Sequence, residues 1–264
     1  MIRLAICIPA YGDTKAKFTL SLANALIHLG EANITDPDGN RLEVETEVFM
    51  VACSMLTESR HRLTAEALVW GATHMLWLDA DHVFPANAFP RLIAANRDVV
   101  GANYARRSVP TAPTACKVVT NEDGEDLKNL VYTTQEKADE GEIEEVDHLG
   151  FGLCMINMRV FDMLQAKADA ETDGNFMPLF KFEDIPGKYG VIGEDVYFFR
   201  KLRDAGAKVY VDHALSWEVG HIHEYIYTNA HANAQKARWA DMGQKQVNRY
   251  EAKIAELEGA AHGD

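Results

Sequence analysis

The sequence has no long apolar run, no paired cysteine motif and no excess of positive charge. No stretch approaches the roughly 20 consecutive apolar residues of a membrane-spanning helix, so we expect no membrane span. The four cysteines, at positions 7, 53, 116 and 154, show no Cys-x-x-Cys spacing and mostly lie in apolar runs, as reduced core thiols do. The first residues lack the layout of a signal peptide, which with the thiols predicts a cytoplasmic protein.

Negative charge dominates the chain. The 26 Lys and Arg residues stand against 40 Asp and Glu residues, a formal net charge of −14. This balance argues against a broad basic surface for nucleic acid or anionic membrane, although it is compatible with a local basic groove. Residues 121–147 hold 11 acidic residues against Lys128 and Lys137, and we interpret this segment as a solvated excursion.

The most informative stretch is residues 74–85, His-Met-Leu-Trp-Leu-Asp-Ala-Asp-His-Val-Phe-Pro. An apolar run of strand length ends in Asp79 and Asp81, and Pro85 prevents the strand from continuing. In open α/β sheets ligands bind beyond the carboxyl ends of the strands, and two carboxylates there can hold Mg²⁺ or Mn²⁺ and, through the ion, a diphosphate. Asp36-Pro37-Asp38 repeats the spacing, but in a turn-rich segment where Asx chemistry explains it.

The hydrophobic periodicity predicts an α/β fold of the doubly wound kind, with a mostly parallel central sheet flanked by helices. We expect one large domain of this type, because 264 residues are enough to bury a substantial core. Residues 106–147 alternate in short segments and predict hairpins at one edge. The predicted strands are 3–8, 48–51, 74–79, 99–104, 148–156 and 209–211, and the predicted helices are 14–29, 57–70, 87–95, 159–168 and 196–205.

Several motifs occur in an order that resembles small GT-A-fold glycosyltransferases of bacteria and their phages, from Ile2 to about Tyr227. They are the Pro9-Ala10-Tyr11 turn, Arg60 and Arg62 on the second helix, Asp79-Ala80-Asp81, the small-residue strand at Gly150-Phe151-Gly152, the Glu194-Asp195 pair and the late His221. The resemblance implies a GT-A domain at 1–228, with a nucleotide-sugar-binding half (1–105) and an acceptor and metal-completing half (106–228). The remaining residues, 229–264, are predicted to form a helical tail.

The resemblance also implies a reaction and a role for each motif. The expected activity is metal-dependent transfer of a sugar from a nucleotide-diphosphate sugar, UDP-sugar being favoured, to a hydroxyl acceptor with inversion. Asp81 would bind Mn²⁺ (or Mg²⁺), Asp79 would contact the ribose or the waters of the metal, and His221 would complete the metal site. Pro9, Ala10, Tyr11, Arg60 and Ala80 would bind the nucleotide, and Asp195, with Glu194 as the alternative, would be the base. The acceptor stays open between a glycan, a small molecule and a modified DNA base.

Other interpretations of these residues remain. His221, between Gly220 and Ile222, also fits an ordinary buried imidazole with a partner, and His213 and His223 compete with it as the ligand. Arg60, Arg106 and Arg107 fit surface charge as well as anion binding. Two acids at a helix start also fit a favourable interaction with the helix dipole. The spacing of Val247, Tyr250, Ile254 and Leu257 predicts a seam that packs on the body or forms a homo-oligomer.

Three rival functions fit parts of the pattern. Leu76 to Val83 also resembles the Asp-x-Asp-x-Val signature of haloacid-dehalogenase phosphatases, in which the first Asp is a nucleophile, but that family carries it on the first strand and not the third. A nucleotidyltransferase would need a glycine-rich loop after the first strand, where residues 9–13 contain a single glycine. A non-catalytic nucleotide- or sugar-binding module would keep the fold without turnover.

Overall fold

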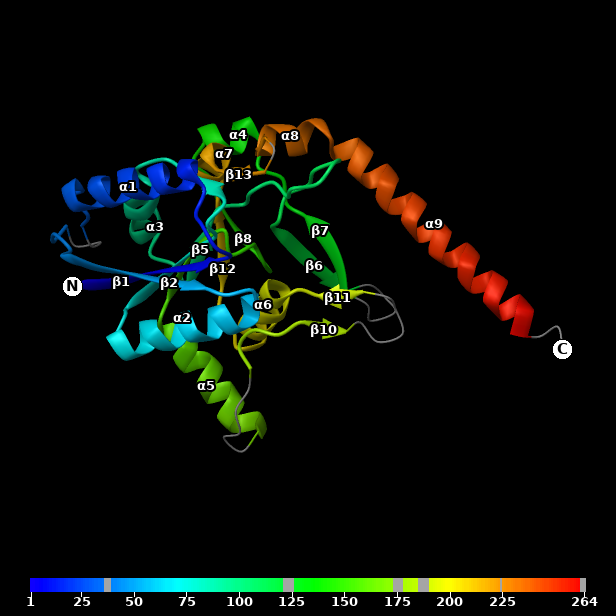
Figure 1. Ribbon diagram of the computed structural model, residues 1–264, viewed down its shortest axis with the longest axis horizontal. Coiled ribbons are helices and arrows are strands. Elements are labelled where there is room, and N and C mark those ends of the chain that lie inside the picture. Colours follow the sequence, from blue (N-terminus) through cyan, green and yellow to red (C-terminus); the bar gives the residue numbers. More distant parts are fainter. Residues whose placement is uncertain (36–38, 121–125, 173–177, 185–189, 224, 262–264) are drawn as a thin grey trace.

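A seven-stranded, mostly parallel sheet forms the centre of the molecule (Figure 1). The computed structural model describes residues 1–35, 39–120, 126–172, 178–184, 190–223 and 225–261. The strand order is β2-β1-β3-β9-β5-β12-β8, in which β9 and β8 run antiparallel to their neighbours. The strands of this sheet are β1 (Ile2–Ala10), β2 (Val44–Ala52), β3 (His74–Leu78), β5 (Val99–Gly101), β8 (Ile143–Val146), β9 (Leu153–Asn157) and β12 (Val209–Asp212). This confirms the expected α/β architecture.

Three smaller antiparallel sheets and nine helices surround the central sheet in the described residues. The small sheets are β14-β13-β4 (Ile226–Tyr227, Gly220–Ile222, His82–Val83), β6-β7 (Cys116–Thr120, Asp126–Leu130) and β10-β11 (Glu183–Asp184, Val191–Ile192). The helices are α1 (Ala16–Glu31), α2 (Leu56–Trp70), α3 (Ala88–Ala95), α4 (Gln135–Asp139), α5 (Arg159–Thr172), α6 (Glu194–Asp204), α7 (His213–Glu218), α8 (Asn229–Ala234) and α9 (Lys236–Ala261).

Each face of the central sheet is covered by its own set of helices, because successive side chains of a strand point to opposite faces. On one face, Cys7 and Trp77 belong to a buried cluster with side chains of α2, α5 and α6. On the other, Ile6 and Leu76 pack with side chains of α1, α3 and α7. Burial on both sides explains why these strands are near-continuous apolar runs in the sequence.

Some predicted boundaries are wrong, each for a local reason. β1 does not stop before Pro9 but continues to Ala10, since a proline near the end of a strand removes only one possible ladder bond. β9 starts at Leu153 and not at residue 148, because Gly152 N donates to the Tyr104 hydroxyl outside the ladder. β5 ends at Gly101, and beyond it Asn103 N donates to Ser216 Oγ.

The region 106–147 is only partly the predicted set of hairpins. The β6-β7 hairpin is present, but α4 follows it, and β8 joins the edge of the central sheet beside β12. The short helix α7 was not predicted either; it begins where the Asp212 side chain accepts a hydrogen bond from Leu215 N. The tip of the hairpin, residues 121–125, lies outside the described residues, as does Asp36-Pro37-Asp38.

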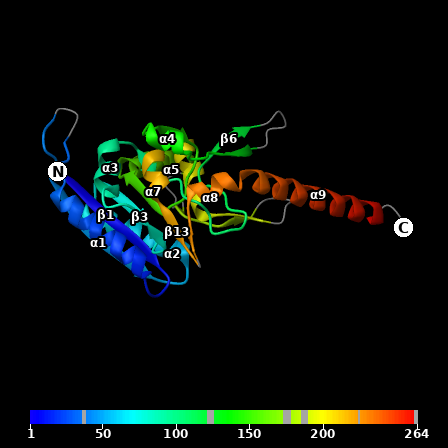
Figure 2. The same cartoon turned by 90° about the horizontal axis from the view of Figure 1, so that it is seen from above.

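Helix α9 projects away from the body of the molecule in both cartoon views (Figure 2). Val247 on this helix is exposed, while the side chains of Tyr250, Ile254 and Leu257 lie outside the description, so packing of the seam stays a prediction.

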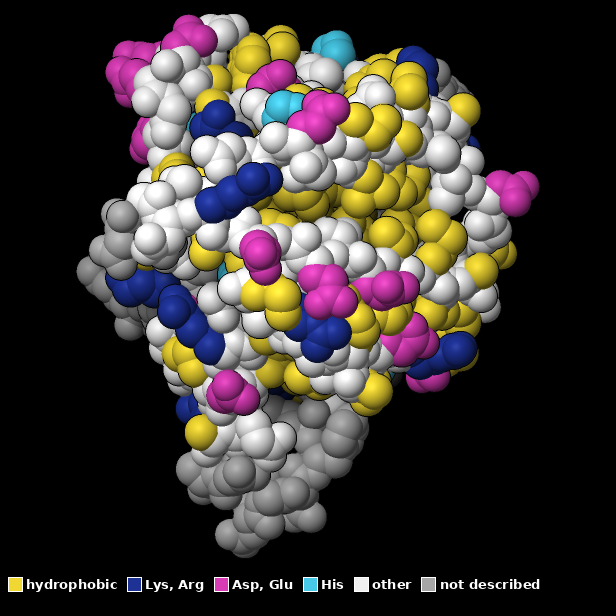
Figure 3. Space-filling view, turned by 90° about the vertical axis from the view of Figure 1, so that its left-hand side faces the viewer, with side chains coloured by type: hydrophobic (Ala, Val, Ile, Leu, Met, Phe, Trp, Pro, Cys, Tyr) yellow, Lys and Arg dark blue, Asp and Glu magenta, His cyan; other side chains and the backbone are white. Residues whose placement is uncertain are grey.

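On the side that carries the N-terminus, hydrophobic side chains gather across the middle of the face with charged ones around them (Figure 3). No helix in the described ranges combines the length and apolar character that crossing a membrane requires.

Candidate active site

A cleft of about 510 Å³ opens at the carboxyl ends of β1 and β3. Parallel strands place their carboxyl ends at one edge of a sheet, so the turns that follow β1 and β3 lie side by side. The cleft is lined by every residue predicted to bind nucleotide or metal: Pro9, Ala10, Tyr11, Arg60, Asp79, Ala80, Asp81 and His221. Arg107, Lys15 and Ser54 also line it, among others. The tertiary structure therefore brings the predicted donor and metal residues into one cavity.

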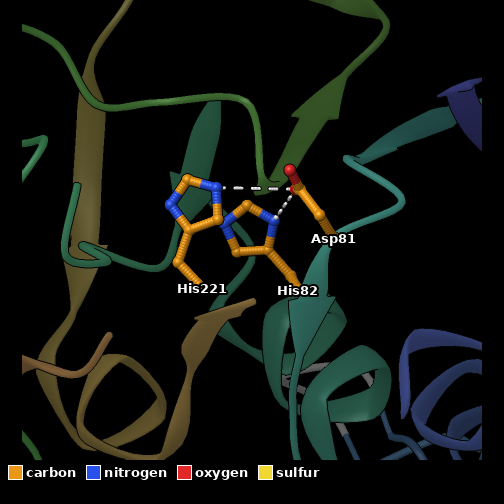
Figure 4. A group of neighbouring side chains, drawn as sticks. All are labelled: Asp81, His82 and His221. Atoms are coloured by element: carbon orange, nitrogen blue, oxygen red, sulfur yellow. Dashed lines mark ion pairs between the residues drawn. The ribbon is translucent and has the colours of Figure 1, made fainter. Parts of the chain in front are cut away.

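Asp81 and His221, which line this cleft, converge with the buried His82 (Figure 4). Asp81 Oδ1 lies 3.1 Å from His82 Nδ1 and 3.5 Å from His221 Nε2, and the potential ligand atoms of the three residues all lie within 4.8 Å of one another. β4 and β13 pair in antiparallel register with His82 opposite His221, so the two rings stack with centroids 4.3 Å apart. Asp81 O accepts a hydrogen bond from Ile222 N at 2.7 Å, which fixes β13 against the Asp-x-Asp turn.

Polar atoms of this cluster are buried without hydrogen bonds. Asp81 Oδ1 and His82 Nδ1 lie 3.1 Å apart, but neither they nor His82 Nε2 make a hydrogen bond of good geometry within the described part of the chain, although His82 is completely buried. His221 Nδ1 lies 3.0 Å from the Ala105 carbonyl oxygen, and this contact orients His221 with Nε2 toward Asp81. Buried polar groups are costly unless a partner satisfies them. One carboxylate and two imidazoles, left in this state, fit a divalent cation of the Mn²⁺ to Zn²⁺ series.

The charge of Asp81 follows from its neighbours. Burial acts to raise its pKa, but contacts with His221 and His82 outweigh burial and hold the pKa well below the ordinary range. Burial lowers the pKa of His221, so its imidazole is neutral and offers a lone pair at neutral pH. Arg107 Nη1 reaches Asp81 Oδ2 at 2.7 Å from the exposed side. The cluster thus presents an ionised carboxylate and a neutral imidazole, the forms that bind metal.

Arg60 of α2 links the two halves of the site. Its buried guanidinium donates from Nε to Glu194 Oε1 and from Nη2 to Asp79 Oδ1, both at 3.2 Å. Burial acts to lower the pKa of Arg60, but the Asp79 and Glu194 carboxylates outweigh burial and raise the pKa above its ordinary value. The guanidinium therefore keeps its positive charge. Arg60 Nη1 has no hydrogen-bond partner among the residues described. Arg60 also lines the first cleft, where an anionic ligand is expected.

Two glycines before β9 allow the cluster to pack closely. A Cβ on Gly152 would lie 2.4 Å from His82 Cε1 and 2.7 Å from Tyr104 Cε1, and a Cβ on Gly150 would lie 2.1 Å from the Tyr104 hydroxyl. Tyr104 in turn packs edge-on against His82, with ring centroids 4.3 Å apart. The Gly150-Phe151-Gly152 segment therefore supports the His82 ring from behind and is not itself part of a strand.

Asp195 and Glu194, adjacent at the start of α6, face different surroundings. Glu194 is buried against Arg60, and burial raises its pKa even with that guanidinium beside it. Asp195 lines a second cleft of about 500 Å³, which shares Arg107 and His221 with the first cleft. Asp195 Oδ1 accepts a hydrogen bond from Val196 N at 2.7 Å. Only Asp195 of the pair therefore opens onto a cavity next to the metal-type cluster.

The remaining sequence candidates lie elsewhere or take other roles. Asp79 forms an ion pair with Arg60 and is not part of the three-residue cluster. Arg62 is exposed on α2. His213 belongs to a separate group with Glu144, and His223 is exposed. His82 was missed, although its position directly after Asp81 was visible in the sequence. Nothing local shows that His82 faces His221, because this depends on a strand pairing between distant segments.

Comparisons with known proteins give a distant likeness. No family model matches the chain, and no curated protein sequence matches it. One similar solved structure is A197 from STIV, with 17% sequence identity and a TM-score of 0.48 over 84% of this chain and 86% of that one. A second is GalNAc-T7 with UDP, GalNAc and Mn²⁺, with 13% identity and a TM-score of 0.49 over 84% of this chain and 44% of that one. A third is the catalytic domain of Drosophila β1,4-galactosyltransferase 7 with xylobiose, with 12% identity and a TM-score of 0.44 over 84% of this chain and 71% of that one. The alignment thus spans less than half of the GalNAc-T7 chain. All three TM-scores lie below 0.5, so the α/β architecture stands on the chain's own strand order.

Proposed function

We propose that the protein is a metal-dependent glycosyltransferase that moves a sugar from a UDP-sugar to a hydroxyl acceptor with inversion. The observation that carries the proposal is the group of Asp81, His82 and His221, two of whose members, Asp81 and His221, line a cleft. Arg60, Asp79 and the end of β1 with Tyr11 line the same cleft. A nucleotide diphosphate needs positive charge at its phosphates and a shaped cavity for its base and ribose. In the proposal, the metal together with Arg60 and Lys15 would provide the positive charge, and the first cleft would provide the cavity, at the edge of the sheet where ligands of α/β proteins bind.

Asp81, His82 and His221 are the residues that would hold the metal, with Asp79 on the ribose or on waters of the metal. The donor set favours Mn²⁺ over Mg²⁺, because imidazole suits the later metals whereas Mg²⁺ prefers oxygen. When bound, the ion would stabilise the negative charge that grows on the leaving diphosphate. Arg60 borders the same cleft, and its spare Nη1 donor would bind a phosphate oxygen of the donor.

In the transfer step, Asp195 would accept the proton of the acceptor hydroxyl as its oxygen attacks the anomeric carbon. A bond forms between the acceptor oxygen and that carbon, while the bond from the carbon to the diphosphate oxygen breaks and UDP leaves with its electron pair. The proton ends on the Asp195 carboxylate, so charge and atoms balance. Because Asp195 lines the second cleft, which adjoins the first at Arg107 and His221, the acceptor would enter there. A single inverting displacement would require its oxygen to attack the anomeric carbon from the side away from the diphosphate.

The phosphatase alternative finds less support. A nucleophilic Asp79 would have to attack a phosphate, but its carboxylate is an acceptor for the buried Arg60 cation. The Asp-x-Asp turn also follows β3, the third strand along the chain. A binding module without turnover would have the same first cleft, and release of UDP from UDP-sugars separates it from an enzyme.

The test is calorimetric titration of UDP with Mn²⁺ present, followed by an assay of metal-dependent UDP release from a panel of UDP-sugars. Asp81→Ala and His221→Ala should each weaken UDP binding by about tenfold or more, because each removes a ligand of the ion that bridges to the diphosphate. His223→Ala is the matched control and should bind like the parent, since His223 is exposed and outside the cluster. Thermal unfolding confirms that each variant is folded. If neither a chelator nor Asp81→Ala changes UDP affinity, the metal site is wrong.

A further inference from the structure

The second cleft, where Asp195 lies, continues into a third hollow of about 250 Å³. The two share Lys128, His148, Ile192 and Val196 as lining residues, so they form one groove between the β6-β7 hairpin and the start of α6. We name this the hairpin groove. The mechanism proposed above uses only its inner end, at Asp195.

The charge of the hairpin groove is opposite to that of the chain. Five cationic residues line it, namely Arg106, Arg107, Lys128, Arg200 and Arg203, against the carboxylates of Asp147 and Asp195. Each of these carboxylates accepts one backbone hydrogen bond, Asp147 Oδ2 from Val118 N at 2.6 Å and Asp195 Oδ1 from Val196 N at 2.7 Å. The whole chain has 26 basic against 40 acidic residues, so such a concentration of cations in one concave place is not its average composition. A cleft lined by one sign of charge focuses the field and attracts ligands of the opposite sign.

Some of these cations are already paired and others are not. Arg107 binds Asp81 at 2.7 Å and Arg200 binds Glu183 at 3.0 Å. Lys128 and Arg106 form no ion pair with a carboxylate in the part of the chain that the structure describes. The Arg106 guanidinium lies 5.8 Å from the Trp239 ring centroid. Burial is the main reason that the pKa of His148, in the same groove, is lowered; Lys128 and Arg106 lower it further, whereas Asp195 acts to raise it.

We propose that the acceptor carries an anionic group, a phosphate or a carboxylate, besides the hydroxyl that receives the sugar. The proposal rests on the proposed function, since it assigns the acceptor to the groove that Asp195 enters. In this proposal the acceptor hydroxyl lies at Asp195, and the anionic group lies against Lys128 and Arg106. Charge-assisted hydrogen bonds from these two cations would stabilise the bound anion. This orientation also keeps the anion away from the Asp195 carboxylate, which would repel it.

The experiment measures binding of three probes to the protein saturated with UDP and Mn²⁺, so that the first cleft is filled. The probes are glucose, glucose 6-phosphate and glucuronate, and calorimetry gives the dissociation constant of each. We expect glucose 6-phosphate or glucuronate to bind about tenfold or more tightly than glucose, the gain typical of one hydrogen-bonded charge. The two charged probes distinguish a phosphate from a carboxylate as the source of the negative charge.

Variants identify the groove as the site of that preference. Lys128→Met should reduce the preference to about threefold or less, because a neutral side chain replaces the attracting cation. Lys128→Glu should abolish the preference, because a negative side chain would repel the anion. Lys245→Met is the matched control, an exposed lysine on α9 outside the groove, and should keep the full preference.

Two results overturn the inference. One is a parent protein that binds glucose as tightly as both charged probes, or binds none of the three. The other is a preference that survives unchanged in both Lys128 variants. Failure of the proposed function looks different: UDP and Mn²⁺ then do not bind to the parent before any probe is added. If the parent protein binds UDP and Mn²⁺ but shows no preference for the charged probes, the anionic acceptor is rejected and the proposed function is not.

Discussion

Two neighbouring carboxylates at the start of α6 show how position alone separates chemical roles. Residues in a helix turn by about 100° each, so adjacent side chains point in different directions. Glu194 turns inward to Arg60, whereas Asp195 turns toward the second cleft. The sequence motif presented the two as alternatives, and the proposal of Asp195 as the base rests on its place in the second cleft, while Glu194 pairs with Arg60.

Asp195→Asn should lose sugar transfer by about 10²–10⁴-fold, the usual contribution of a general base, while UDP and Mn²⁺ bind normally. Glu194→Gln should instead lower the free energy of unfolding by about 1–3 kcal/mol, because the buried Arg60 cation keeps an acceptor but loses one of its two negative partners. Transfer kinetics, calorimetry and denaturant unfolding measure the three quantities. An Asp195→Asn enzyme that turns over like the parent would place the base elsewhere.

At the scale of elements, the metal-type cluster depends on a three-stranded sheet and on one tight turn. β13 pairs with β4, which puts His221 beside His82, and the turn at Gly152 packs behind His82. The sequence predicted Asp81 and His221 as ligands from the order of motifs. It did not predict His82, because a histidine directly after an Asp-x-Asp turn has no local signal of which face it occupies.

Gly152→Ala should disturb this packing, since the added methyl group would lie within 2.4–2.7 Å of His82 and Tyr104 atoms. We expect a loss of about 1–3 kcal/mol in stability from overpacking, together with weaker Mn²⁺ binding, because the His82 ring has to move. Gly30→Ala on α1 is the control, since a Cβ there meets no atom within 4 Å. Thermal unfolding and Mn²⁺ titration report the two effects. Unchanged metal affinity in a destabilised Gly152→Ala protein would argue against His82 as a ligand.

At the scale of the whole molecule, an acidic excursion is tied to the edge of the sheet by Glu144 of β8. Its carboxylate pairs with Lys117 of β6 at 2.7 Å, with Lys137 of α4 and with His213 of α7 at 3.0 Å. Glu142 lies in the same group. Although Glu142, Glu144 and His213 lie close enough to hold an ion, the two lysines already neutralise the carboxylates. The interpretation of residues 121–147 as solvated excursion is therefore only partly right, since β8 belongs to the central sheet.

Stability at acid pH should depend on Glu144. Burial acts to raise its pKa, but its basic neighbours outweigh burial and lower the pKa from 4.5 to about 2. A lowered carboxyl pKa stabilises the folded state above the unfolded pKa, and this contribution is lost as the pH falls through the folded one. Glu144→Gln should therefore be less stable than the parent at neutral pH, and the difference should shrink between about pH 5 and pH 2. Urea unfolding at several pH values measures it; a difference that does not vary with pH would contradict the assignment.

The sequence by itself determined the alternation of strands and helices and the carboxylates at the end of β3. Both are local properties: apolar periodicity reports which residues must be buried, and Asp79 and Asp81 follow directly from where the apolar run ends. Only the tertiary structure decided which side chains meet. It paired Asp79 with Arg60, put His82 beside His221 and put Asp195 in a groove lined by cations. Strand pairing and helix packing bring together segments that are far apart along the chain, and no local sequence pattern shows which segments will meet.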